Sequence, residues 1–173
     1  MSSRIGWFVL GIVATLVGIV AGGYLFIRFG GMPMDTSAKP LPLEGRIAGM
    51  ALRASIGNAR DTKNPLPVDE TNLLVAADLY SEHCSGCHGI PGRPPSFISK
   101  GMFPQPPQLF EKDDMVTRSP EGITFWKVTH GIRMTGMPGF GKTLTTTQRW
   151  QITMLVSRAD KLPPKVRTAL NPD

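Results

Sequence analysis

The residues that decide the fold are Cys84-Ser85-Gly86-Cys87-His88. In a C-x-x-C-H motif each thiol can form a thioether with a vinyl group of haem, and the adjacent imidazole can bind the iron. This spacing suits the chemistry because all three bonds must be reached from one helical turn. The rival interpretations are a zinc site and a redox dithiol. A zinc site needs two more ligands, although the chain has no other cysteine, and a dithiol of the thioredoxin kind needs a βαβ context that the sequence lacks.

Residues 134–140, with the sequence MTGMPGF, supply a candidate ligand for the opposite face of the haem. A thioether is a soft ligand suited to iron, and the surroundings of Met137 favour this role. Gly136 lets the backbone approach the ring closely, and Pro138 holds the preceding residue in an extended conformation. The rival ligands are Met134, His83 and His130.

End signals predict three helices around these motifs, and no stretch gives a convincing strand signal. A first helix should lead into the haem motif, a second should lead toward residues 134–140, and a third should close the domain. Asp69 or Thr71 should cap the first helix. Ser119 should cap the second helix, with Pro120 at its first position and Gly131 at its end. Thr145 and Gln148 should form a capping box for the third helix, which Pro163-Pro164 should end.

In combination, LYSEHCSGCHG, PPQL and GIRMTGMPGFG resemble the single-haem class I c-type cytochromes. The resemblance covers about residues 69–158. It implies an all-α fold of three to four helices around one covalent haem c with its iron. It also implies thioethers at Cys84 and Cys87, with His88 and Met137 as the axial metal ligands.

The resemblance extends to the packing around the haem. Pro107 and Leu109 match the family's Pro-x-Leu, which implies that the Pro107 carbonyl accepts a hydrogen bond from His88 and that Leu109 packs on the ring. Pro106 could take the place of Pro107. Where the first and last helices cross, the family usually has glycine and an aromatic residue, and this chain has Ala76 and Tyr80.

Residues 5–27 are uncharged and mostly apolar. As a helix they would rise about 34 Å, enough to cross a bilayer core of about 30 Å. A cleaved signal peptide is the competing interpretation, but its apolar core usually has only about 7–15 residues. The basic residues that follow favour a cytoplasmic C-terminal side. The resemblance implies the opposite, a single-pass protein of the bacterial inner membrane with its haem domain on the periplasmic face.

The sequence therefore predicts four segments. They are a transmembrane anchor at 1–28, a linker at 29–68 with a short helix at 43–58, a cytochrome c domain at 69–162 and a tail at 163–173. Arginines recur every seven residues in and just after the short helix. It is either a basic helix that binds anionic lipid or an acidic partner, or a short helix packed on the domain with a solvated basic face.

Charge is spread along the chain, which has 19 Lys and Arg against 13 Asp and Glu. We therefore expect no nucleic-acid partner, because phosphate binding needs basic residues gathered on one surface. Five basic residues near the motifs could steer an acidic partner or simply keep the domain soluble. These residues are Lys100, Lys112, Lys127, Arg133 and Lys142.

With both axial positions filled, iron keeps no open position for a small-molecule substrate. The sequence thus predicts an electron carrier rather than an enzyme, with a positive midpoint potential. It would be tethered to the lipid bilayer and would shuttle single electrons between redox protein partners of a respiratory chain. The alternatives are a fixed cytochrome c subunit of a larger membrane oxidoreductase and a haem sensor or peroxidase-like enzyme with a labile methionine bond.

Overall fold

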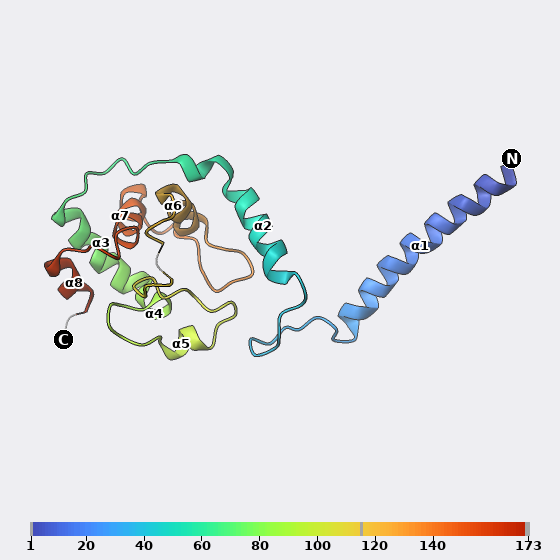
Figure 1. The fold of residues 1–173 in the computed structure, drawn as a ribbon, viewed down its shortest axis with the longest axis horizontal. Helices are drawn as coiled ribbons and strands as arrows, with labels where there is room; N and C mark the ends of the chain where they lie inside the picture. Colours follow the sequence, from blue (N-terminus) through green and yellow to red (C-terminus); the bar gives the residue numbers. More distant parts are fainter. Residues whose placement is uncertain (1, 115, 172–173) are drawn as a thin grey trace. The chain divides into compact units, whose positions relative to one another are not determined.

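The computed structural model describes residues 2–114 and 116–171, and within these ranges the chain forms helices and no strand. Figure 1 shows their order along the chain. They are α1 (Ser2–Arg28), α2 (Glu44–Ile56), the 3-10 helix η1 (Gly57–Asp61), α3 (Glu70–His83), α4 (Ser85–His88), α5 (Phe97–Lys100), α6 (Glu121–His130), α7 (Thr146–Val156) and α8 (Pro164–Leu170). The chain divides into two compact units, Met1–Gly45 and Arg46–Asp173.

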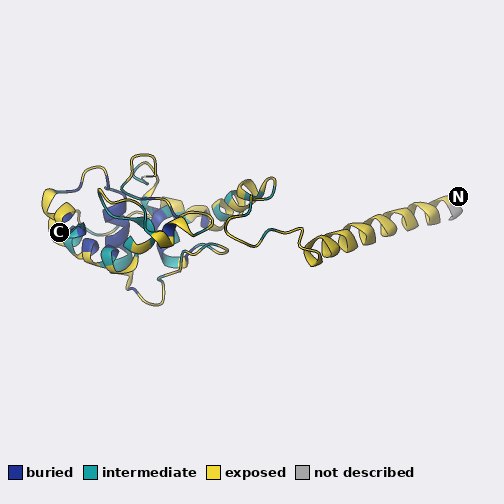
Figure 2. Ribbon diagram, turned by 90° about the horizontal axis from the view of Figure 1, so that it is seen from below, coloured by how far each residue is buried: buried dark blue, intermediate teal, exposed yellow. Residues whose placement is uncertain are grey.

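The first unit contains α1, which includes the whole apolar run that the sequence suggested. By length and composition, residues Arg4–Arg28 are able to cross a membrane. Their side chains are exposed throughout, including large ones such as Trp7 and Phe8 (Figure 2). A contiguous exposed apolar surface of this kind is typical of a segment that contacts a membrane or another protein.

The short helix expected at residues 43–58 is α2, and it ends earlier, at Ile56. Gly57 has a φ of +47°, which breaks the α-helix, and η1 follows. Ile56 is buried, whereas Arg53 on α2 is exposed. The backbone of η1 contacts α6 at Gly122, where a Cβ atom would overlap the carbonyl oxygen of Ala59. Close backbone contact therefore joins η1 to α6.

The core of the second unit lies between α3, α7 and α8, which are dark blue in Figure 2 where buried. Asp69 caps α3, as one of the two expected caps, by accepting a hydrogen bond from Asn72 N at 2.8 Å. Ala76 and Tyr80 are fully buried in this core. Met154 of α7 belongs to the same cluster, so α3 meets the last helices at the residues that the resemblance indicated.

The sequence correctly predicted the start of α7 but not its end. Thr145 and Gln148 form the expected capping box. The helix ends at Val156, and Pro163-Pro164 opens α8 instead of terminating α7. Proline suits the first helical turn, because its missing N–H has no partner there in any case.

Residues 163–173, which the sequence analysis assigned to a tail, therefore include a packed helix. Val166 and Leu170 of α8 are buried in the cluster that contains Leu73 of α3. The boundary expected at residue 162 thus falls inside the hydrophobic core. A two-proline sequence marks a break between helices but carries no information on whether the next segment packs.

The start of α6 also differs from the expectation. Pro120 is the N-cap residue, and no side chain caps the helix, so Ser119 does not have the predicted role. The helix ends at Gly131, as expected, with a φ of +69°. Stacking of Phe125 on Trp150, with ring centroids 3.8 Å apart, joins α6 to α7.

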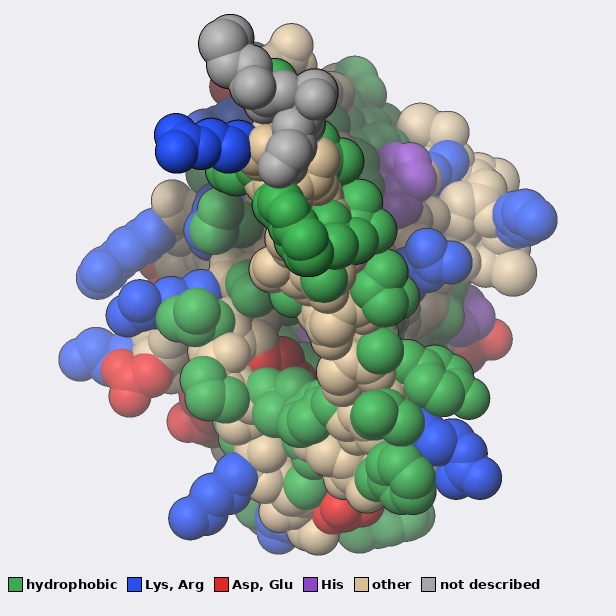
Figure 3. Space-filling view, turned by 90° about the vertical axis from the view of Figure 1, so that its right-hand side faces the viewer, with side chains coloured by type: hydrophobic (Ala, Val, Ile, Leu, Met, Phe, Trp, Pro, Cys, Tyr) green, Lys and Arg blue, Asp and Glu red, His purple; other side chains and the backbone are tan. Residues whose placement is uncertain are grey.

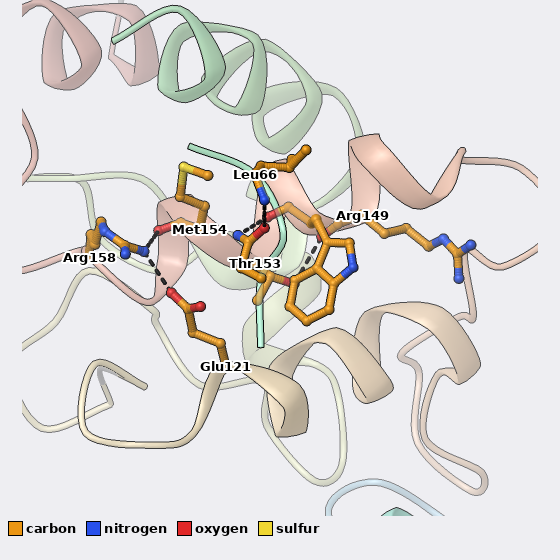
Figure 4. A network of polar contacts seen from close by, with 8 residues as sticks. Leu66, Glu121, Arg149, Thr153, Met154 and Arg158 are labelled. Carbon is orange, nitrogen blue, oxygen red and sulfur yellow. Dashed lines mark hydrogen bonds and ion pairs between the residues drawn. The ribbon is translucent and has the colours of Figure 1, made fainter. Parts of the chain in front are cut away.

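A polar network also holds α7 in place (Figure 4). Arg158 donates to Glu121 of α6 at 2.7 Å and to the Met154 carbonyl at 3.3 Å. On the other side, the Asn64 amide donates to the Trp150 carbonyl at 3.2 Å. The helix α6, which leads into the loop of Met137, is therefore fixed to α7 by both apolar and polar contacts.

Candidate haem site

One helical turn, α4, carries the cysteines and the histidine of the C-x-x-C-H motif. Cys84 ends α3 and begins α4, and its carbonyl accepts hydrogen bonds from Cys87 N at 3.1 Å and from His88 N at 2.9 Å. The two thiols are free, and all three side chains line the same cavity. The structure thus brings together the three groups that the motif requires.

The cavity lies between α3, α4, α6 and α7 and two loops, at residues 102–109 and 132–140. Its empty space, including the part open to solvent, is about 1070 Å³. Most of the wall is apolar, with side chains such as Leu109, Val128 and Ile152. An apolar wall suits a porphyrin ring. The donors suit a covalent haem, because the α4 turn supplies two thiols and an imidazole and the loops supply thioethers.

On the proximal side, His88 Nδ1 lies 2.9 Å from the carbonyl oxygen of Pro107. A carbonyl only accepts, so Nδ1 carries the proton and Nε2 is free to bind a metal. The contact is made by Pro107, not by Pro106, and Leu109 also lines the cavity. Burial lowers the pKa of His88, which favours the neutral imidazole that a metal ligand must be, while the bond to Pro107 opposes this shift.

Sequence reasoning missed Gln108, the variable residue of Pro-x-Leu. Its side chain is buried, and its amide nitrogen lies within hydrogen-bond distance of Cys87 O at 3.1 Å, Ser99 Oγ at 2.9 Å and Pro106 O at 3.1 Å. Gln108 therefore connects α4, α5 and the proximal loop. Nothing local marks this role, since its partners are up to 21 positions away.

The α3 side of the cavity is fixed by Tyr80. Its hydroxyl donates to the carbonyl of Gly89 at 2.8 Å, directly after the haem motif. Burial raises the pKa of the Tyr80 phenol, which therefore remains a neutral donor. Burial likewise raises the pKa of the Cys84 thiol, to about 12.

On the distal side, the structure separates the candidate ligands. Met137 is half-buried and lines the cavity. Met134 is 83% exposed and does not line it, and His130 is exposed with Nδ1 2.9 Å from Trp126 O. His83 lies in the cavity wall, next to Cys84.

Met102 is a second thioether at the cavity, and no sequence motif predicted it. Its methyl group occupies the place that a Cβ atom at Gly136 would take. The Met102 side chain thus packs directly on Gly136, so the two methionine-bearing loops are in contact. No local pattern marks Met102, because its loop meets Gly136 only in the folded chain.

The loop that carries Met137 is tied back onto α6. Gly131 turns the chain with its positive φ, and a Cβ there would lie 2.7 Å from the Met137 carbonyl oxygen. That oxygen accepts from Ile132 N at 3.2 Å, and Phe140 N donates to Val128 O at 2.9 Å. Both ends of the loop are therefore bonded, which fixes the position of Met137 in the wall.

One of the five basic residues near the motifs is not a surface charge. Lys127 is half-buried on α6 and lines the cavity, and burial lowers its pKa. The others, Lys100, Lys112, Arg133 and Lys142, are exposed. On the face shown in Figure 3, Lys and Arg side chains are scattered rather than gathered in one patch.

Helices that enclose an apolar cavity, with C-x-x-C-H on one wall and a thioether in another, define a c-type cytochrome domain. Comparison with protein families agrees: residues 72–154 match the family described as cytochrome C oxidase, cbb3-type, subunit III. Residues 72–154 therefore form a c-type cytochrome domain, which carries covalently bound haem c with iron. A comparison with curated proteins found no match. In the described ranges, no group of three or more His, Cys, Asp or Glu side chains is arranged to hold a metal ion.

Proposed function

We propose that this chain is a membrane-tethered electron carrier whose haem is attached through Cys84 and Cys87 and bound axially by His88 and Met137. The observation that carries the proposal is that all four side chains line one cavity. When bound, the haem supplies an iron that gains and loses a single electron. A chain that fills both axial positions leaves no site for a substrate, so electron transfer is the activity that remains.

The chain's own residues would hold this site in one geometry. The Pro107 carbonyl fixes the His88 imidazole and keeps its proton on Nδ1. The thioether of Met137 and the apolar wall favour ferrous iron, because both disfavour the additional positive charge of the ferric state. We therefore expect a positive midpoint potential.

Three methionine variants test the axial ligand in the full-length protein, loaded with haem in detergent. Met137→Ala should abolish the weak far-red absorption band that reports an iron–thioether bond, lower the midpoint potential and allow the reduced protein to bind carbon monoxide. Met134→Ala is the matched control, because that side chain is exposed. Met102→Ala tests the second thioether at the cavity. Loss of the band in Met102→Ala, with retention in Met137→Ala, would contradict the proposed ligand.

We also propose that α1 is a retained anchor and that the haem domain lies on the periplasmic face of a bacterial inner membrane. The length and apolarity of α1 support the anchor. The resemblance to class I c-type cytochromes supports the periplasmic face, because in that family the haem is attached on the outer side of the inner membrane. Protease added to intact spheroplasts should digest the cytochrome domain. A protected domain would show the opposite orientation.

A fixed subunit of a membrane oxidoreductase is the second candidate, and the matched family favours it because its description names a subunit of an oxidase. Native sizing of gently solubilised membranes separates the two functions. A free carrier should migrate alone, whereas a subunit should co-migrate with a larger complex that contains further redox centres. Either outcome requires the same haem site.

A further inference from the structure

Lys127 has an unusual position for a lysine. It lies on α6 in the wall of the haem cavity, one turn after Thr124, which is 8% exposed and lines the same wall. The titratable side chains of the wall are Tyr80, His83, Cys84, Cys87, His88 and Lys127. None of these is a carboxylic acid, and within the described ranges no ion pair involves Lys127.

A half-buried ammonium without a carboxylate partner is unfavourable. Removing the charge from water costs free energy that only an opposite charge or good hydrogen bonds restore. Burial accordingly lowers the pKa of Lys127. The cavity wall offers no carboxylate of the chain itself, so an acidic group on the occupant of the cavity would compensate this charge.

Haem c carries two propionate carboxylates, and its vinyl groups are the ones used by the cysteines. We propose that Lys127 is the counter-cation of a haem propionate, which it pairs with by an ammonium–carboxylate hydrogen bond. The inference rests on the haem site but not on which methionine binds the iron. Its ligand is the carboxylate of the cofactor rather than the metal.

The pair would keep the propionate ionised in both redox states. Without the Lys127 cation, the pKa of the propionate would rise. The rise would be larger in the reduced protein, because ferrous iron has one positive charge fewer than ferric iron to stabilise the carboxylate. Reduction by one electron would then be accompanied by uptake of one proton at that carboxylate. The midpoint potential would fall with rising pH across the range in which the carboxylate titrates.

The test is the midpoint potential of the haem-loaded full-length protein between pH 5 and about pH 8, in four forms. They are the wild type, Lys127→Gln, Lys127→Arg and Lys161→Gln, the last because Lys161 is exposed and does not line the cavity. Lys127→Gln should gain a downward slope that the wild type and Lys161→Gln do not share, and Lys127→Arg should behave like the wild type. Because His83 also faces the cavity, the slopes are compared between variants.

Reduced-minus-oxidised infrared spectra provide a second measurement that includes the wild type. The wild type and Lys127→Arg should show no protonated carboxylic acid band from haem labelled at its propionates, and Lys127→Gln should show one. A protonated band in the wild type, or equal slopes in Lys127→Gln and Lys161→Gln, would overturn the proposal. The far-red band should persist in Lys127→Gln, which separates this outcome from a failure of the Met137 assignment.

Discussion

The ion pair between Glu121 and Arg158 provides a quantitative test of how α6 is held against α7. The Arg158 Nη1 and Glu121 Oε1 atoms are 2.7 Å apart, and the two side chains are only 26% and 23% exposed for Glu121 and Arg158. A hydrogen bond to a charged group contributes about 1.5–3 kcal/mol. Partial exposure screens the charges, so we expect a coupling free energy of about 1–2 kcal/mol.

The coupling is measured by a double-mutant cycle of Glu121→Gln and Arg158→Gln. Arg158 also donates to the Met154 carbonyl, and the cycle cancels that contribution because it is lost in both arms. Unfolding in urea, which adds no salt, is followed by the visible absorption of the haem-loaded protein in detergent. This signal reports the cytochrome domain and not α1.

The chain contains its own control, the pair between Lys165 and Glu70. Its atoms are 3.0 Å apart, but the side chains are 76% and 47% exposed. Such pairs contribute about 0.2–1 kcal/mol and weaken with salt. We expect the control to fall at the low end of that range and to vanish in high salt. Equal coupling in the two cycles, or a coupling below about 0.5 kcal/mol for Glu121 and Arg158, would refute the reasoning.

Three further substitutions have defined outcomes in the same unfolding assay. Tyr80→Phe should cost about 1 kcal/mol of unfolding free energy, because it leaves the Gly89 carbonyl without its donor. Burial raises the pKa of Tyr80 above its ordinary 10.0, so above that pH the unfolded wild type loses a proton that the folded wild type keeps. The wild type should therefore lose stability relative to this variant as the pH rises above 10.0. Gly131→Ala should cost about 2 kcal/mol or more and weaken the far-red band, because the φ is +69° and a Cβ would lie 2.7 Å from Met137 O. Trp150→Ala should cost about 3–5 kcal/mol, since the ring is 4% exposed.

Local patterns predicted what depends on neighbours in the sequence. The C-x-x-C-H turn, the capping box at Thr145 and the end of α6 at Gly131 each need residues only a few positions apart. Long apolar runs are similarly local, so α1 matched the expected span. Such features can be predicted because hydrogen bonds and backbone angles within one turn do not require the rest of the fold.

Features that depend on contacts between distant segments could not be predicted from the sequence. Gln108 is buried by partners on α4 and α5, and Met102 meets Gly136 across the cavity. No local pattern distinguishes Lys127 from the exposed lysines, because its position in the cavity wall depends on how α6 packs. The sequence already favoured Met137 over Met134, but only the folded chain shows that Met134 is exposed and does not line the cavity.

The amino-acid sequence alone determined that this chain carries a covalent haem and an apolar N-terminal helix, because both signals consist of residue types at short, fixed spacing. Only the tertiary structure decided that α8 closes the core, that Met137 rather than Met134 lines the cavity and that Lys127 is partly removed from water. Whether a side chain is buried depends on which distant segments of the chain cover it. The hydrophobic effect is non-directional, so a residue's neighbours in the sequence do not specify those segments.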